Sequence, residues 1–203
     1  MSLKIAITQI NATVGDLAGN AAKILDFARR ASAQGADLLL TPELALCGHS
    51  PEDLLLREDF HAACAQELAA LTAALPEIDV LIGHPLRQDG HCFNAASLLR
   101  AGRCVATFRK QSLSQDELRY FVPGDTPDEL NIRGVRCAVA IGADATSPAT
   151  GADLRLALDA SPFQLGRQRH KAVGLPMVLA NLVGGQDEMV FEGASFAQDS
   201  EGS

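Results

Sequence analysis

Apolar residues along the first third of the chain follow two kinds of pattern, which predict alternating strands and helices. A short β-branched run at residues 3–10 is followed at 19–37 by a segment whose apolar residues recur at helical spacing, with Gly35 as its cap. A second apolar run at 37–43 completes a strand–helix–strand order, which is typical of a parallel crossover. Residues 51–75 predict one or two further helices.

The remaining two thirds of the chain are rich in predicted strands. They include a hairpin that turns at Ala101 and Gly102, three buried-type strands, and a closing strand or hairpin; the ranges are 79–85, 93–100, 103–110, 135–141, 153–160, 176–183 and 188–202. The three buried-type strands resemble parallel strands, which need long crossovers. Because the connections between them are short or polar, two crossover helices are expected to be missing or stunted.

Composition and charge argue against several classes of function. The chain has 203 residues, 47% of them hydrophobic and 21% charged, and a net charge of −8, which indicates one globular domain without the basic face of a nucleic-acid binder. It shows neither a membrane-spanning apolar run nor a leader segment, so we expect a cytoplasmic protein. Five cysteines without a C-x-x-C pair and five scattered histidines predict free thiols and no metal site.

Two charged residues follow predicted strands at positions where α/β sheets bind ligands. Glu43 comes directly after one strand and Lys110 directly after another, while a third strand ends at Gly142. Taken alone, each charge is more simply a helix cap or a solvated surface group. Their joint occurrence favours one pocket at which three strand ends converge.

Several segments resemble a known family. The stretches "TPELALCG", "SPEDLLLR", "RYFVPGD", "LDASPF" and "NLVGGQDE" are similar to the glutamine-hydrolysing domain of glutamine-dependent NAD synthetases, a branch of the nitrilase or carbon–nitrogen hydrolase superfamily. The resemblance covers residues 1–203 as one domain. It implies an α/β fold, a four-layer α-β-β-α sandwich, and a Glu-Lys-Cys catalytic triad.

The resemblance gives Glu43 and Lys110 the roles of the first two triad members. In such a triad a thiolate attacks the amide carbonyl of glutamine, while the carboxylate takes the thiol proton and returns it to the departing ammonia. A buried cation stabilises the oxyanion of the tetrahedral intermediate. Glu43 fits the first task and Lys110 the second, and each helps to keep the other ionised in an apolar pocket.

The third member of the triad is missing. By resemblance, the catalytic cysteine of the family corresponds to residue 142, which is a glycine in this chain. Cys137 lies five residues upstream, on the opposite face of the strand and about 16 Å along it. Cys47 follows Glu43 closely, but its thiol would meet the carbonyl from another direction. As written, the chain is therefore expected to be inactive.

Three more residues match substrate-binding positions of the family by resemblance. Glu117 corresponds to a second carboxylate near the lysine, and Ser161 and Arg167 would hold the amino-acid head group of glutamine, the guanidinium by a bidentate grip on a carboxylate. A turn residue and a surface charge are equally good interpretations of Ser161 and Arg167. His49 stands where relatives usually carry a tyrosine.

Loops near residues 113–116, 145–151 and 166–172 are shorter than in the family. Shortening of this kind fits a decayed or regulatory relative, an engineered chain, or residues omitted from the sequence. Omitted residues would still leave Gly142 unexplained, because a gap cannot change the identity of a residue.

The leading functional hypothesis is a glutamine amidohydrolase domain that would supply ammonia for the synthesis of NAD from deamido-NAD. By resemblance, ATP and deamido-NAD would belong to an absent synthetase domain, this domain would need no cofactor, and the chain would form a homo-oligomer. The alternative is a non-catalytic scaffold or regulatory binding module of the same superfamily. A nitrilase-type amidase for another small amide would need the same missing thiol.

Overall fold

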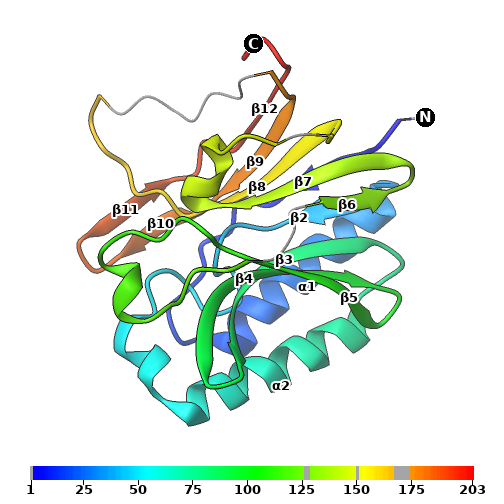
Figure 1. Ribbon diagram of the computed structural model, residues 1–203. Coiled ribbons are helices and arrows are strands. Elements are labelled where there is room, and N and C mark those ends of the chain that lie inside the picture. Colours follow the sequence, from blue (N-terminus) through cyan, green and yellow to red (C-terminus); the bar gives the residue numbers. More distant parts are fainter. Residues whose placement is uncertain (1, 126–128, 150, 167–173) are drawn as a thin grey trace.

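Two five-stranded sheets pack face to face in the computed structural model, which describes residues 2–125, 129–149, 151–166 and 174–203 (Figure 1). The first sheet has the order β1-β2-β3-β4-β5, with β1 to β3 parallel and β4 and β5 antiparallel to their neighbours. Its strands are β1 (Ile5–Ile7), β2 (Leu38–Leu40), β3 (Asp79–Gln88), β4 (His91–Arg100) and β5 (Arg103–Arg109).

The second sheet has the order β12-β9-β8-β7-β6, and its three central strands are parallel. A separate hairpin of β10 and β11 follows β9 along the chain. The bounds are β6 (Glu129–Ile132), β7 (Val135–Ile141), β8 (Leu154–Asp159), β9 (Met177–Asn181), β10 (Val183–Gln186), β11 (Met189–Glu192) and β12 (Phe196–Gln198).

Two long helices, α1 (Leu17–Ala33) and α2 (Glu58–Ala74), cover the outer face of the first sheet (Figure 1). The side chain of Asp16 begins α1 by accepting a hydrogen bond from the Gly19 amide at 3.0 Å. Gly35 ends it with a positive φ of 70°, as predicted for a C-terminal cap. The two largest buried clusters lie on either side of the first sheet, one against the helices and one between the sheets.

The expected loss of crossover helices is confirmed where the structure describes the connections. Between β7 and β8 the described residues form only η3 (Gly142–Thr146), a 3₁₀ helix. The connection from β8 to β9 includes residues 167–173, which lie outside the described part. The other short helices are η1 (Glu52–Leu56) and η2 (Glu117–Arg119). The α/β class and the sandwich of two sheets agree with the prediction.

Two details differ from the sequence interpretation. The strands predicted at 79–85 and 93–100 extend toward each other and form a continuous hairpin, β3–β4, that turns at Asp89 and Gly90, both with positive φ. The run at 176–183 is divided between β9 and β10, and β10 pairs with β11 rather than with the large sheet. An apolar run does not show where a strand leaves its sheet.

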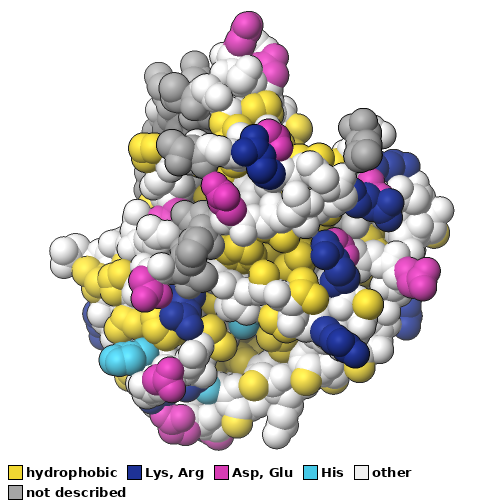
Figure 2. Space-filling view, turned by 45° about the vertical axis from the view of Figure 1, so that its right-hand side comes forward, with side chains coloured by type: hydrophobic (Ala, Val, Ile, Leu, Met, Phe, Trp, Pro, Cys, Tyr) yellow, Lys and Arg dark blue, Asp and Glu magenta, His cyan; other side chains and the backbone are white. Residues whose placement is uncertain are grey.

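Charged side chains of both signs are interspersed on the face in Figure 2, leaving aside the atoms drawn grey. In the part of the chain that the structure describes, no helix is long and apolar enough to cross a membrane.

A buried histidine makes the fold sensitive to acid. His84 on β3 is 2% exposed and hydrogen-bonds to the Pro85 carbonyl at 3.0 Å and to the Ser97 hydroxyl at 2.8 Å. Burial lowers the pKa of His84 from 6.5 to about 4, although the bond to the Pro85 carbonyl acts in the opposite direction. Folded His84 is therefore neutral over a pH range in which an unfolded histidine gains a proton.

We expect the free energy of unfolding to fall as the pH decreases from about 6.5 to about 4, by about 3 kcal/mol from this group. In that window the unfolded chain binds more protons than the folded chain, so stability rises with pH. Urea unfolding at a series of pH values measures the slope. His84→Gln should flatten it, leaving a remainder from His49, whose pKa burial also lowers. His91→Gln, at an exposed position, is the matched control; an unchanged slope in His84→Gln would contradict the assignment.

Candidate functional site

Three predicted residues lie together at one end of the sandwich, where the chain leaves three strands. Glu43 follows β2, Lys110 comes directly after β5, and Gly142 comes directly after β7. The first two belong to one sheet and the third to the other. The site therefore depends on how the two sheets face each other.

The turn that carries Glu43 lies very close to β3. A Cβ atom at Gly83 would stand 2.5 Å from the Pro42 carbonyl oxygen and 2.6 Å from the Leu44 amide nitrogen, so only glycine fits at this point of the strand. The close approach buries Glu43, which is 2% exposed.

Lys110 is a buried ammonium between two carboxylates. Its Nζ donates to Glu43 Oε1 at 2.8 Å and to Glu117 Oε1 at 2.6 Å, and the residue is 5% exposed. Burial acts to lower the pKa of Lys110, but the two carboxylates outweigh it and hold this pKa above its ordinary value. The same ion pair lowers the pKa of Glu117 against the opposing effect of burial. Lys110 is charged throughout the physiological pH range.

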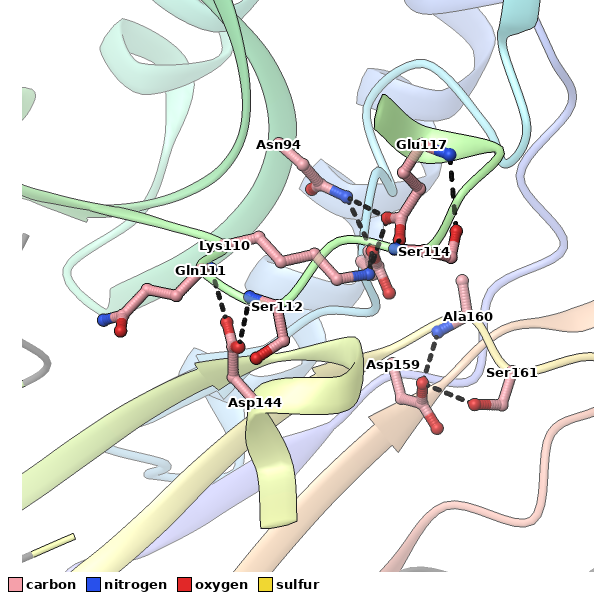
Figure 3. Close-up of polar contacts among 11 residues, drawn as sticks. Asn94, Lys110, Gln111, Ser112, Ser114, Glu117, Asp144, Asp159, Ala160 and Ser161 are labelled. Atoms are coloured by element: carbon pink, nitrogen blue, oxygen red, sulfur yellow. Dashed lines mark hydrogen bonds and ion pairs between the residues drawn. The ribbon is translucent and has the colours of Figure 1, made fainter. Parts of the chain in front are cut away.

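Asn94 on β4 joins this cluster, and Figure 3 shows it pointing toward Lys110 and Glu117. Its Nδ2 donates to Glu43 Oε1 at 2.6 Å, and it lies 3.5 Å from Glu117 Oε1. The strand pairing places Asn94 there, because the Lys110 amide donates to the Asn94 carbonyl at 2.8 Å. At 1% exposure, Asn94 is as buried as Glu43, whereas the side chain of Glu117 is 16% exposed.

Gly142 faces the charged pair directly. Its φ is +54°, and a Cβ atom built there would lie 2.5 Å from Lys110 Nζ and 2.9 Å from Glu43 Oε2. A side chain at this position would thus point at the cation and at the second oxygen of the glutamate. Gly142 itself supplies no atom that can attack a carbonyl.

The turn η3, which begins with Gly142, is held from two sides. Asp144 accepts hydrogen bonds from the amides of Gln111 and Ser112, at 2.9 and 2.8 Å, and so ties the second sheet to the segment after Lys110 (Figure 3). From β8, the buried Arg155 donates to the carbonyls of Ala145 and Ser147. These contacts fix the turn in the absence of a long crossover helix.

A cavity of about 570 Å³ opens over these residues, within the usual size range of ligand pockets. Ser161 lines it and donates to Asp159 Oδ1 at 2.8 Å, and its contact with the head group of glutamine stays a prediction. Arg167, predicted to hold a carboxylate, lies outside the described residues. The lining from the described chain also includes Glu43, Leu44, His49, Ser50, Glu52, Lys110, Ser114, Asp116, Glu117, Arg119, Tyr120, Phe121, Gly142, Ala143, Asp159, Ala160, Pro162, Gln164 and Met189.

Neither candidate substitute thiol lines this cavity. Cys137 is completely buried and packs in the cluster between the sheets. Cys47 is also completely buried, in a separate apolar cluster, and its Sγ lies 3.3 Å from the Gly48 carbonyl oxygen. Burial raises the pKa of Cys47 well above its ordinary value, so this thiol is a poor nucleophile. Across the described ranges, no three His, Cys, Asp or Glu side chains gather as a metal site would require.

The arrangement defines a class of protein. The carbon–nitrogen hydrolase family model matches residues 4–203, and the chain belongs to that family. It is 37% identical to a glutamine-dependent NAD(+) synthetase of Xanthomonas campestris, covering all of this chain and 41% of the relative.

Solved structures of two related proteins agree with this family assignment. A glutamine-dependent NAD+ synthetase from Acinetobacter baumannii matches with a TM-score of 0.92 and 30% identity over 99% of this chain and 42% of that one. A mutant of the Nesterenkonia amidase, from the nitrilase superfamily, matches with a TM-score of 0.85 and 28% identity over 99% of this chain and 84% of that one. The chain thus spans about two fifths of the length of the synthetases it resembles.

Sequence reasoning missed three polar residues that shape the site: Asn94, Asp144 and Asp159. Asn94 interrupts a strand that is otherwise almost entirely apolar at its buried positions, and Asp159 is an acidic residue at the end of a buried strand. Both are signals that a search for buried polar residues would have found.

Gly142→Ala should destabilise the protein more than Gly35→Ala does. Both positions have positive φ, where alanine costs roughly 1–2 kcal/mol, but an added Cβ at Gly35 meets nothing within 4 Å. At Gly142 the Lys110 ammonium must also move from its hydrogen bonds, which adds roughly 1 kcal/mol. Urea unfolding of both variants measures the difference. Equal losses would show that Lys110 moves without cost.

Proposed function

We propose that this chain is a glutamine-amidohydrolase domain of the glutamine-dependent NAD synthetase type that has lost its nucleophile and does not hydrolyse glutamine. The observation that carries the proposal is the geometry at Gly142, where a side chain would face both Lys110 Nζ and Glu43 Oε2. The similarity to the synthetases supports glutamine as the ligand.

The chemistry of an active relative shows what is absent. A thiol at this position would pass its proton to the carboxylate and attack the amide carbon, while the ammonium stabilises the negative oxygen. The carboxylate would then protonate the leaving nitrogen, so that ammonia departs and water hydrolyses the thioester. Glu43 and Lys110 stay paired at 2.8 Å beside Gly142, which supports their proposed roles in proton transfer and charge stabilisation. No bond to carbon can form from Gly142.

A neighbour in the superfamily illustrates the dependence on sulfur. In a glutamate-to-glutamine mutant of the Nesterenkonia amidase, acrylamide is added at the active-site cysteine. By analogy, the reactive atom in this family is a thiol, and we infer that its loss leaves a pocket that can bind without reacting.

The proposal includes partners. In an active synthetase the ammonia from glutamine would serve the conversion of deamido-NAD to NAD, with ATP and deamido-NAD on a synthetase domain. The fraction of the relatives' length that the chain covers supports a separate domain of this kind. We also propose that the chain forms a homo-oligomer and needs no cofactor of its own.

A regulatory binding module is the second candidate. The cavity of about 570 Å³ favours it, since a pocket of that size remains although the attacking atom is missing. A pure scaffold would not need the pocket.

The unmodified chain should release no ammonia from glutamine above the uncatalysed rate, because no cysteine lines the described part of the cavity. A coupled ammonia assay measures this, and titration calorimetry with glutamine shows whether the pocket binds. Binding without ammonia release supports the vestigial glutamine site. Stability that depends on a protein partner, without glutamine binding, supports the scaffold, and measurable turnover contradicts the proposal.

Gly142→Cys should restore at most a trace of glutaminase activity. The new side chain would adopt a left-handed backbone conformation, and its Cβ would stand 2.5 Å from Lys110 Nζ, so the ammonium must move before the thiol can work. The shortened loops would still be unrestored. Ammonia release by Gly142→Cys is compared with that by Gly142→Ser, which has a similar size and a much weaker nucleophile; full activity of the cysteine variant would refute the expectation.

A further inference from the structure

We infer that Asn94 is a positioning residue that fixes the orientation of the Glu43 carboxylate and the seat of the Lys110 ammonium. Its use in ligand binding rests on the proposed function, but its place in the site does not. Asn94 is an uncharged residue among charged ones. It donates a hydrogen bond to Glu43 Oε1, the same oxygen to which Lys110 donates.

The contacts form a closed ring of two donors and two acceptors. Lys110 Nζ binds Glu43 Oε1 at 2.8 Å and Glu117 Oε1 at 2.6 Å, while Asn94 Nδ2 contacts the same two oxygens at 2.6 and 3.5 Å. The two like-charged oxygens therefore share two donors. Without the amide, one ammonium alone would have to hold both carboxylates together.

The amide orientation follows from the charges. If the side chain were flipped, Asn94 Oδ1 would lie beside the carboxylate oxygen that Nδ2 now contacts at 2.6 Å, and two acceptors would face each other. In the present orientation Oδ1 is buried without a hydrogen-bond partner in the described part of the chain. The site thus leaves one acceptor unpaired in order to place a donor on Glu43.

The ring determines which oxygen of Glu43 faces the cavity. Oε1 receives both donors, whereas Oε2 points at the space over Gly142, 2.9 Å from a Cβ atom built there. Glu117 is fixed in a similar way, since its second oxygen accepts from the Ser114 amide at 2.9 Å. A ligand that enters the cavity therefore meets one preset oxygen of Glu43 next to the ammonium.

Two variants separate the donor from the shape of the side chain. Asn94→Asp keeps the shape and replaces the donors by acceptors, and Asn94→Ala removes both. Ser97→Ala is the matched control, because Ser97 is also buried on β4 and hydrogen-bonded, but to His84 and Thr107. All three variants lose a buried polar contact on β4. Only the two Asn94 variants change a residue of the ring.

The primary measurement is protection of the Lys110 ammonium from hydrogen exchange by NMR, together with stability in urea. We expect protection to fall at least tenfold in Asn94→Ala and in Asn94→Asp, with no change in Ser97→Ala despite its loss of stability. If Asn94→Asp retains the protection of the parent, shape alone is sufficient and the inference is wrong. If either variant is too unstable to measure, the other one decides.

Calorimetry with glutamine supplies an independent readout. If the parent chain binds glutamine, Asn94→Ala should weaken binding at least tenfold while Ser97→Ala leaves it unchanged; equal weakening would overturn the positioning role. If the parent does not bind glutamine, the proposed function fails, and lysine protection still tests the ring.

Discussion

A buried ammonium held by two carboxylates is the contact on which the rest of the site depends. Lys110 binds Glu43 and Glu117, and through them it joins the turn after β2, the end of β5 and η2. Each partner alone would be costly to bury, because an unpaired charge loses its hydration without compensation. Together they form a unit that is stable only as a whole.

The cluster of Lys110, Glu43 and Glu117 contributes little net free energy to folding, and stability alone therefore does not explain why it is present. Apolar groups of similar volume often replace buried ion pairs at no cost, whereas the removal of one partner typically costs 3–5 kcal/mol. The buried Glu43, the partly buried Glu117, one ammonium and an amide oxygen without a partner in the described chain therefore add little to folding stability, which favours the proposed binding role.

Much of the fold could be predicted because the strand ends carry clear signals. The hairpin at Ala101 and Gly102 and the helix cap at Gly35 follow from turn chemistry, and the parallel strands follow from their apolar runs. The turn at Asp89 and Gly90 was missed because polar residues at the ends of β3 and β4 obscured how far the strands extend.

The site was predicted in part for a different reason. Glu43 and Lys110 are charged residues that follow strands, and the topology brings such positions together. Asn94 and Asp144 act through hydrogen bonds to partners 51 and 32 residues away in the sequence, which no local pattern can show. The contact of Asn94 becomes clear only from the register of the strands, which places Asn94 beside Lys110.

The two halves of the site have different physical roles, and this explains how one can persist without the other. Glu43, Asn94, Lys110 and Glu117 lie on the first sheet and on the segments that follow its strands. They neutralise and orient one another, so their contacts need no atom from Gly142. The second sheet contributes the turn η3, tied by Asp144 to the segment after Lys110, and the end of β8 with Asp159 and Ser161. Under the proposed function, loss of a nucleophile at the start of that turn would remove the bond-forming step and leave the charged cluster in place. Binding and chemistry would then be separable.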